Sequence, residues 1–133
     1  MDHINVVIEK DAFARYTGIE VVEHSPGRAK VRMAVRDHHR NGLGMVHGGA
    51  IFTLADYAFA AACNSHGFAS VAINASISYL KSPTGAVLQA EAEEAVVDGK
   101  MGSCLVRVLD EDGSIVAMFQ GLSYRKSQAN QRP

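Results

Sequence analysis

Residues Gly49 to Asn64 carry the pattern that most limits the folds open to this chain. Apolar side chains recur there at helical spacing, and alanines fill most of the positions between them. The recurring positions are Ile51, Leu54, Ala55, Ala58, Phe59 and Ala62. A helix on a protein surface shows a polar face, whereas this one is apolar nearly all round. We therefore expect it to lie inside a shell formed by the rest of the chain.

The segments on both sides of this helix show strand patterns. A short helix (Glu9 to Tyr16) precedes two strands, Ile19–Glu23 and Ala29–Arg36, which flank "HSPG" and predict a hairpin. Gly67 is expected to stop the long helix in the left-handed conformation. Four further strands are predicted at Ser70–Leu80, Val87–Val97, Met101–Leu109 and Ile115–Arg125. The turns "DGK" and "DEDGS" are too short for a parallel return, so these strands are expected to be antiparallel.

The predicted fold class is α+β, with one long central helix wrapped by a curved antiparallel sheet. A chain of 133 residues suits a single domain, which we assign to residues 1–126, with residues 127–133 as a disordered C-terminal tail. A single sheet around one helix leaves its outer surface and its edges uncovered. Oligomerisation is the expected way to cover them.

Composition and charge exclude several classes of protein. The formal net charge is -1 and 47% of the residues are hydrophobic, as in a soluble globular protein, and nothing in the bulk charge points to nucleic acid. The longest apolar run is interrupted by Asp56 and Asn64 and the N-terminus lacks a secretory signal, so we expect a cytoplasmic protein without a membrane partner. Cys63 and Cys104 are expected to be buried free thiols. The six histidines lack the spacing of a zinc site, so no metal is assigned.

Glycines and a histidine stand directly before the long helix, in "GLGMVHGG". A dinucleotide fingerprint is rejected, because His47 occupies the position of its third glycine and no parallel crossover follows. Gly48 and Gly49 would instead present backbone N–H groups at the positive end of a helix dipole. That arrangement can form an oxyanion hole.

Asp56 is a carboxylate within the apolar helix. An unpaired carboxylate in apolar surroundings is costly and tends to have a raised pKa, so it usually has a task or a partner. Catalysis and a structural bond to a neighbouring strand or subunit both remain open on the residues alone. His47 likewise fits a general acid or base, a hydrogen-bond donor beside the oxyanion, or an organiser of the loop.

The stretch "NGLGMVHGGAIFTLADYAFAAACNSHG" (Asn41 to Gly67), followed by "INASISYLKSP", resembles the hotdog-fold acyl-CoA thioesterases of the PaaI (phenylacetic acid degradation) type. The resemblance extends more loosely over nearly the whole chain. It implies a sheet wrapped around one helix, homodimers commonly paired into homotetramers, and active sites at subunit interfaces. It also implies an acyl-CoA substrate and no separate cofactor, since coenzyme A is part of the substrate.

The resemblance implies a role for each matching residue. Asp56 would act as general base or nucleophile on the thioester carbonyl, and Asn41 would help to place the water. His47 and Gly48 would orient and polarise the thioester oxygen, with the Gly48 N–H as the oxyanion donor. Gly49 and Phe52 are expected to contact the substrate.

One position departs from the pattern of some relatives, which carry a serine or threonine on the strand after the helix. The matching residue is Ala72, and Ser70 and Asn74 stand two residues to either side. We expect Ser70 and Asn74 to bind substrate. The third active-site group of those relatives is thus in question here.

The acyl group and two other functions stay open at this point. The resemblance favours aryl-acyl thioesters of the phenylacetyl or hydroxyphenylacetyl kind, whereas the alanines near Asp56 would suit a medium aliphatic chain. A hotdog hydratase could use His47 and Asp56 as an acid/base pair. A non-catalytic acyl-CoA-binding module, or an interaction domain in which Asp56 forms an interface hydrogen bond, would show no turnover.

Overall fold

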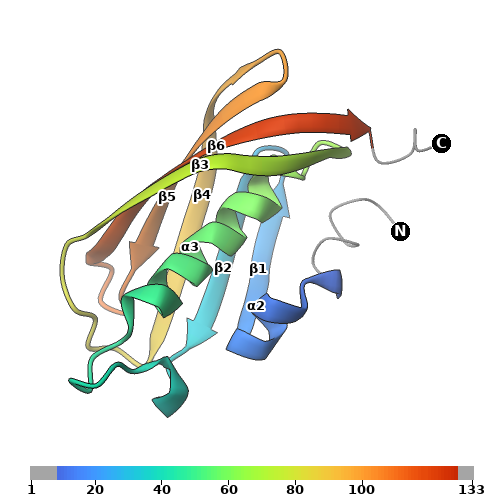
Figure 1. The fold of residues 1–133 in the computed structure, drawn as a ribbon. Helices are drawn as coiled ribbons and strands as arrows, with labels where there is room; N and C mark the ends of the chain where they lie inside the picture. Colours follow the sequence, from blue (N-terminus) through green and yellow to red (C-terminus); the bar gives the residue numbers. More distant parts are fainter. Residues whose placement is uncertain (1–8, 129–133) are drawn as a thin grey trace.

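The central helix, α3 (Gly48–Cys63), lies across the concave face of one antiparallel sheet in the computed structural model, which describes residues 9–128 and side chains to residue 126 (Figure 1). The sheet has the strand order β1-β2-β4-β5-β6-β3. Its strands are β1 (Ile19–Ser25), β2 (Arg28–Ala34), β3 (Phe68–Tyr79), β4 (Val87–Asp98), β5 (Met101–Leu109) and β6 (Ile115–Gln128). The predicted α+β hotdog architecture is confirmed.

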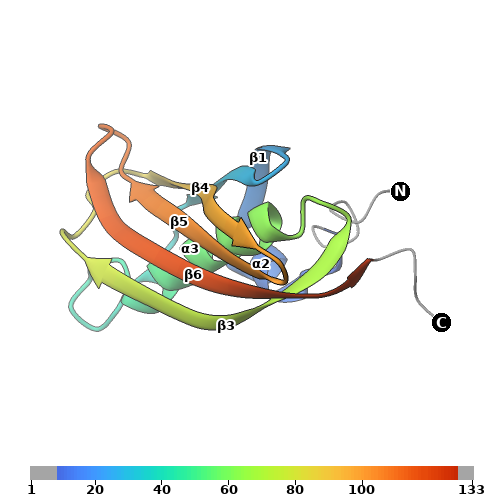
Figure 2. The same cartoon turned by 90° about the horizontal axis from the view of Figure 1, so that it is seen from above.

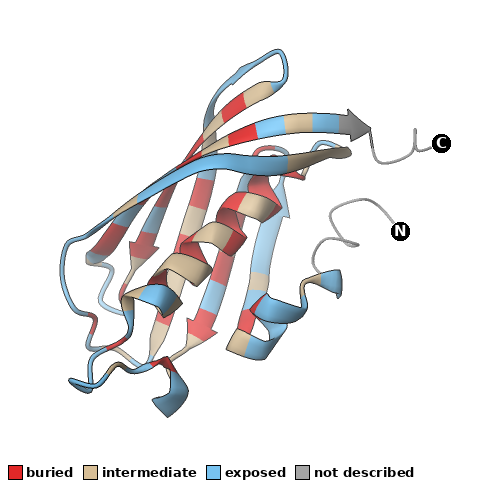
Figure 3. Ribbon diagram, in the orientation of Figure 1, coloured by how far each residue is buried: buried red, intermediate tan, exposed pale blue. Residues whose placement is uncertain are grey.

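The core forms between α3 and the inner face of the sheet. Alternate residues of the central strands point at the helix and are fully buried, as are most residues of α3. Beyond the first turn of α3, the positions that stay half-buried are Phe52, Thr53, Asp56 and Ala60, and three of them are spaced four residues apart. They form a stripe on the side of the helix that the sheet leaves uncovered (Figure 3). The predicted all-round burial of the helix is therefore incomplete, and Asp56 lies on the side that the sheet does not cover.

The N-terminal helix is shorter than predicted. The predicted helix from Glu9 to Tyr16 is interrupted at Asp11, which is not helical, and α2 covers Ala12–Thr17. The Asp11 carboxylate accepts the N–H of Ala14 at 2.9 Å and thereby caps α2. An N-cap residue has non-helical backbone angles, which explains the break.

The C-terminal end of α3 also differs from the prediction. The helix ends at Cys63, and Asn64 is its C-cap, with a φ of -96°. Gly67 does take the left-handed conformation, with a φ of 84°, but it does so three residues later, in the loop to β3. The buried Asn64 side chain replaces a glycine cap by donating to the Ala60 carbonyl at 3.0 Å.

The predicted strands and hairpins are confirmed, with small shifts at their ends. β6 extends to Gln128, so residues 127 and 128 belong to the sheet and not to the predicted tail. Residues 129–133 of that tail lie outside the described residues. Within residues 9–128, β3 pairs with β6 alone and forms one edge of the sheet, which is visible from above in Figure 2.

Cys63 and Cys104 are buried free thiols, as predicted. Burial raises the pKa of each thiol to about 12, so neither is a ready nucleophile. Within residues 9–128, no helix is long and apolar enough to cross a bilayer.

Gly121 provides a test of the packing between α3 and β6. A Cβ at this position would lie 2.7 Å from three ring atoms of Phe59, which is almost completely buried. We expect Gly121→Ala to lower the free energy of unfolding by about 1–3 kcal/mol, because a packed core accommodates an added methyl group only with strain. Urea denaturation measures this. Gly42→Ala is the matched control, since nothing lies within 4 Å of its Cβ position, and equal stability of the two variants would contradict this packing.

Candidate active site at the start of the central helix

The loop before α3 is organised by Asn41. Its side-chain Oδ1 accepts the backbone N–H groups of Leu43 at 2.9 Å and Met45 at 3.1 Å, and its own N–H donates to the Met45 carbonyl at 2.8 Å. The Asn41 Nδ2 has no hydrogen-bond acceptor among the described residues. Asn41 therefore shapes the loop through its oxygen and keeps its nitrogen available to a water or a substrate.

His39 ties this loop to the rest of the chain. Its Nδ1 accepts the Arg36 N–H at 2.9 Å, so its Nε2 carries the proton and donates to the Thr17 carbonyl at 2.6 Å. Burial lowers the pKa of His39, which favours this neutral form. The His39 carbonyl accepts the N–H of His47 at 2.7 Å. The sequence marked His39 only as a histidine without a metal-site pattern, so this supporting role was missed.

The peptide between His47 and Gly48 is held at its carbonyl end. The His47 carbonyl accepts the N–H groups of Ala50 at 3.0 Å and Ile51 at 3.2 Å. The N–H of Gly48, at the other end of this peptide, has no acceptor among the described residues. It lies at the N-terminus of α3, where the helix dipole favours negative charge. This is the geometry of a preorganised oxyanion donor, at the residue to which the resemblance assigns that task.

The next peptide, between Gly48 and Gly49, is held at both ends by side chains. The Gly49 N–H donates to His47 Nδ1 at 2.7 Å, and the Gly48 carbonyl accepts the Tyr79 hydroxyl at 3.0 Å. Of the two predicted N–H groups, only that of Gly48 is thus left for a ligand. Because His47 uses Nδ1 as an acceptor, its remaining N–H is on Nε2 and can donate from an exposed ring.

Asp56 lies in the half-buried stripe of α3 and has no hydrogen bond or ion pair with any described residue. Its pKa is raised, mainly because burial desolvates the carboxylate and further because the negative charge of Asp11 acts on it. Eight residues of helix separate Gly48 from Asp56, which is about 12 Å along the axis. A single thioester carbonyl cannot contact the N–H of Gly48 and the carboxylate of Asp56 of one chain.

The other predicted substrate contacts are spread along α3 and β3. Phe52 packs edge-on against Phe119, with ring centroids 5.5 Å apart, and so belongs partly to the core. The backbone of Ser70 binds the Asn64 side chain at the far end of α3. Asn74 is exposed. A bulge in β3 lies between Ala72 and Asn74. One chain therefore does not gather the predicted site residues around a single point.

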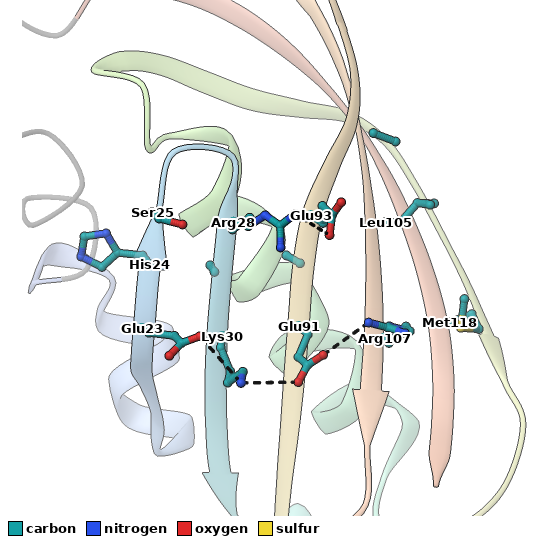
Figure 4. Close-up of a pocket in the computed structure, with 13 residues that line it drawn as sticks. Glu23, His24, Ser25, Arg28, Lys30, Glu91, Glu93, Leu105, Arg107 and Met118 are labelled. Atoms are coloured by element: carbon teal, nitrogen blue, oxygen red, sulfur yellow. Dashed lines mark hydrogen bonds and ion pairs between the residues drawn. The ribbon is translucent and has the colours of Figure 1, made fainter. Parts of the chain in front are cut away.

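A charged groove of about 650 Å³ lies on the other face of the sheet (Figure 4). Its cations already have acidic partners: Lys30 pairs with Glu23 and Glu91 at 3.7 Å, Arg107 with Glu91 at 3.5 Å, and Arg28 with Glu93 at 3.4 Å. The sheet separates this groove from α3. It is therefore not the site formed by Gly48 and Asp56.

Comparisons with known proteins identify a family and several relatives of this chain. The thioesterase superfamily matches residues 43–117 of the chain. A protein of Archaeoglobus fulgidus is 40% identical over 109 residues, which are 81% of this chain and 71% of that protein. The acyl-coenzyme A thioesterase PaaI of Escherichia coli is 36% identical over 122 residues, which are 91% of this chain and 87% of PaaI.

Solved structures show the same likeness. The E. coli PaaI structure matches with a TM-score of 0.90 and 34% identity, covering 95% of this chain and 92% of PaaI. A Streptococcus mutans protein, solved bound to acetyl CoA, matches with a TM-score of 0.79 and 27% identity, covering 84% of this chain and 90% of that one.

The family match and the similarity to PaaI define the chain as a thioester hydrolase. The chain belongs to the thioesterase superfamily, and it is similar over nearly its whole length to PaaI.

Proposed function

We propose that this chain is an acyl-CoA thioesterase that releases coenzyme A from aryl-acyl or medium-chain acyl thioesters. One observation carries the proposal: the unoccupied N–H of Gly48 and the carboxylate of Asp56, which lacks a partner among the described residues, lie on the same helix. Acyl transfer needs a donor for the developing oxyanion and a group that activates the nucleophile. The acetyl CoA bound to the S. mutans protein and the activity of E. coli PaaI support the coenzyme A thioester as substrate.

We infer that two copies of the chain build each active site. Because about 12 Å of helix separates Gly48 from Asp56, the Gly48 of one subunit must meet the Asp56 of another. The edge strand β3 offers the interface, since among the described strands its 12 residues pair with β6 alone. Val71 and Ile73 are apolar side chains exposed on this edge. Two copies of β3 can pair around a two-fold axis, and two such dimers can form the homotetramer implied by the resemblance.

Hydrolysis follows from these groups in a simple order. The thioester oxygen accepts the N–H of Gly48, and the ring N–H of His47 lies beside it as a second donor. Asp56 removes a proton from water as that water attacks the carbonyl carbon, or attacks the carbon itself to form an anhydride that water then cleaves. The C–S bond breaks, the departing coenzyme A thiolate takes up the proton released from the water, and the products are the free acid and the thiol of coenzyme A. Asn41 would hold the water through Nδ2.

The proposal also specifies the chemical class of the acyl group. E. coli PaaI comes from the phenylacetic acid degradation operon, which favours an aryl-acyl group. The half-buried stripe of α3 that would border the acyl group contains Phe52 and Ala60, one aromatic and one small side chain. An aryl ring or a short aliphatic chain can lie along such a surface.

A panel of aryl-acyl and aliphatic acyl-CoAs tests the proposal, with thiol release followed by a thiol-reactive chromophore. We expect turnover with a clear rank order, phenylacetyl-like thioesters being cleaved with the highest kcat/KM. An enoyl-CoA belongs in the panel, because its hydration without thiol release would indicate a hydratase. Binding of acyl-CoA with no release from any member would instead identify a binding module.

A further inference from the structure

Tyr79 is fixed in position by the end of β3. It is the last residue of the strand and pairs with Ala117 of β6. The two residues after it, Leu80 and Lys81, both donate their N–H groups to the Val116 carbonyl, at 2.8 and 3.3 Å. The backbone of Tyr79 therefore has little freedom, although its side chain is half exposed.

The Tyr79 side chain lies against the first residue of α3, 31 positions earlier in the sequence. Its hydroxyl donates to the Gly48 carbonyl at 3.0 Å. A Cβ on Gly48 would lie 3.3 Å from the Tyr79 Cζ and 3.4 Å from two other atoms of the phenol. The ring is therefore in contact with Gly48, and the close approach requires that this residue be a glycine or that the ring move.

Glycine has more backbone freedom than any other residue. Two adjacent glycines therefore do not fix the position of a catalytic N–H unless other groups restrain them. His47 and Tyr79 provide the restraint, because they hold the N–H and the carbonyl of the same Gly48–Gly49 peptide. The N–H of Gly48 is attached to the same Cα as that carbonyl. A displacement of this Cα away from the Tyr79 ring would therefore also move the N–H, whereas a rotation about the Cα–C bond alone would not.

We propose that Tyr79 is a positioning residue for the oxyanion donor. Tyr79 holds Gly48 in place so that the Gly48 N–H points at the thioester oxygen. The inference rests on the proposed thioesterase function and adds a residue that contacts Gly48 and not the reacting atoms. The oxyanion develops only in the transition state, so a loosened donor lowers kcat more than it changes KM.

The test compares Tyr79→Phe with Tyr79→Ala in the thiol-release assay. Tyr79→Phe keeps the ring and removes the hydroxyl, and we expect it to lower kcat about fivefold to tenfold with KM unchanged, the loss typical of one hydrogen bond. Tyr79→Ala removes the ring as well and should lower kcat further, so that phenylalanine gives partial rescue. Tyr124→Phe is the control: Tyr124 lies on β6, next to β3, and its ring faces the Lys100 ammonium and not Gly48.

The outcomes separate this inference from the function on which it rests. Wild-type turnover with an unchanged kcat in Tyr79→Phe, or a loss confined to KM, overturns the inference and leaves the thioesterase in place. Absence of wild-type turnover on every thioester overturns the function and, with it, the inference. Hydrogen exchange at the Gly49 amide gives a readout without turnover: exchange should be faster in Tyr79→Phe, and an unchanged rate would overturn the inference.

Discussion

Asp56→Asn is expected to lower kcat at least about a hundredfold while the protein stays folded, because asparagine keeps the shape of the side chain and removes the base or nucleophile. The thiol-release assay on the best substrate of the panel measures this loss. Thr53→Ser is a matched control on the same half-buried stripe of α3: it retains the hydroxyl that donates to the Gly49 carbonyl. We expect near wild-type kcat for this control.

The pH dependence of Asp56 has a definite sign. Burial raises the pKa of this carboxyl above its ordinary value of 3.8, and the charge of Asp11 adds to the rise. Only the ionised form can take a proton or attack, so kcat/KM of the wild type should rise with pH through the raised pKa. Asp11→Asn should move this limb to lower pH. A limb at or below pH 3.8 would contradict the assignment.

The raised pKa of Asp56 also makes the free energy of unfolding depend on pH, and this free energy falls where activity rises. Between pH 3.8 and the raised pKa, the folded protein holds more protons on Asp56 than the unfolded chain does, so the free energy of unfolding falls as pH rises through this window. Asp56→Asn removes the ionisation and should be at least as stable as the wild type at neutral pH. A lower melting temperature, or loss of the oligomer with turnover intact, would instead show that Asp56 forms a structural interface bond.

Local patterns were sufficient to predict most of the fold. The apolar spacing in α3 and the turns that join β4, β5 and β6 depend on neighbours in sequence, and these elements were placed within a few residues. The strand order could not be obtained in this way. β3 follows α3 in the chain yet lies at the far edge beyond β6, while β4 returns to pair with β2. A long helical crossover does not specify where the next strand pairs.

Some residues of the candidate site can likewise be predicted from local sequence, whereas the contacts between distant residues cannot. Asp56 and Gly48 are visible in the sequence, because a carboxylate within an apolar helix and glycines before its first turn are local anomalies. The contacts of Tyr79 with Gly48 and of His39 with Thr17 join residues 31 and 22 positions apart, so no local signal announces them. The N-cap at Asp11 is local and could have been found from the helix-start pattern, whereas its effect on Asp56 depends on how the helices pack.

A pair of inactive chains should restore activity when they form one dimer. Asp56→Asn lacks the carboxylate. Gly48→Val keeps its backbone N–H but should misplace it, because a side chain at position 48 meets the Tyr79 ring. We expect each variant alone to lose about a hundredfold or more in kcat. If Gly48 of one subunit works with Asp56 of the other, the mixed dimer contains one site with both groups intact and one site with neither.

Two differently tagged chains, expressed together and purified through both tags, isolate this mixed dimer. Because a two-fold dimer has two equivalent sites, the mixed species should recover about half of the wild-type kcat per dimer. Melting temperature and mass of each variant dimer control for folding and assembly. If both groups acted within one chain, each half of the mixed dimer would carry one defect and activity would stay at the level of the parents. The 12 Å of helix between Gly48 and Asp56 makes the first result the expected one, since no substrate carbonyl of about 1 Å can span that distance.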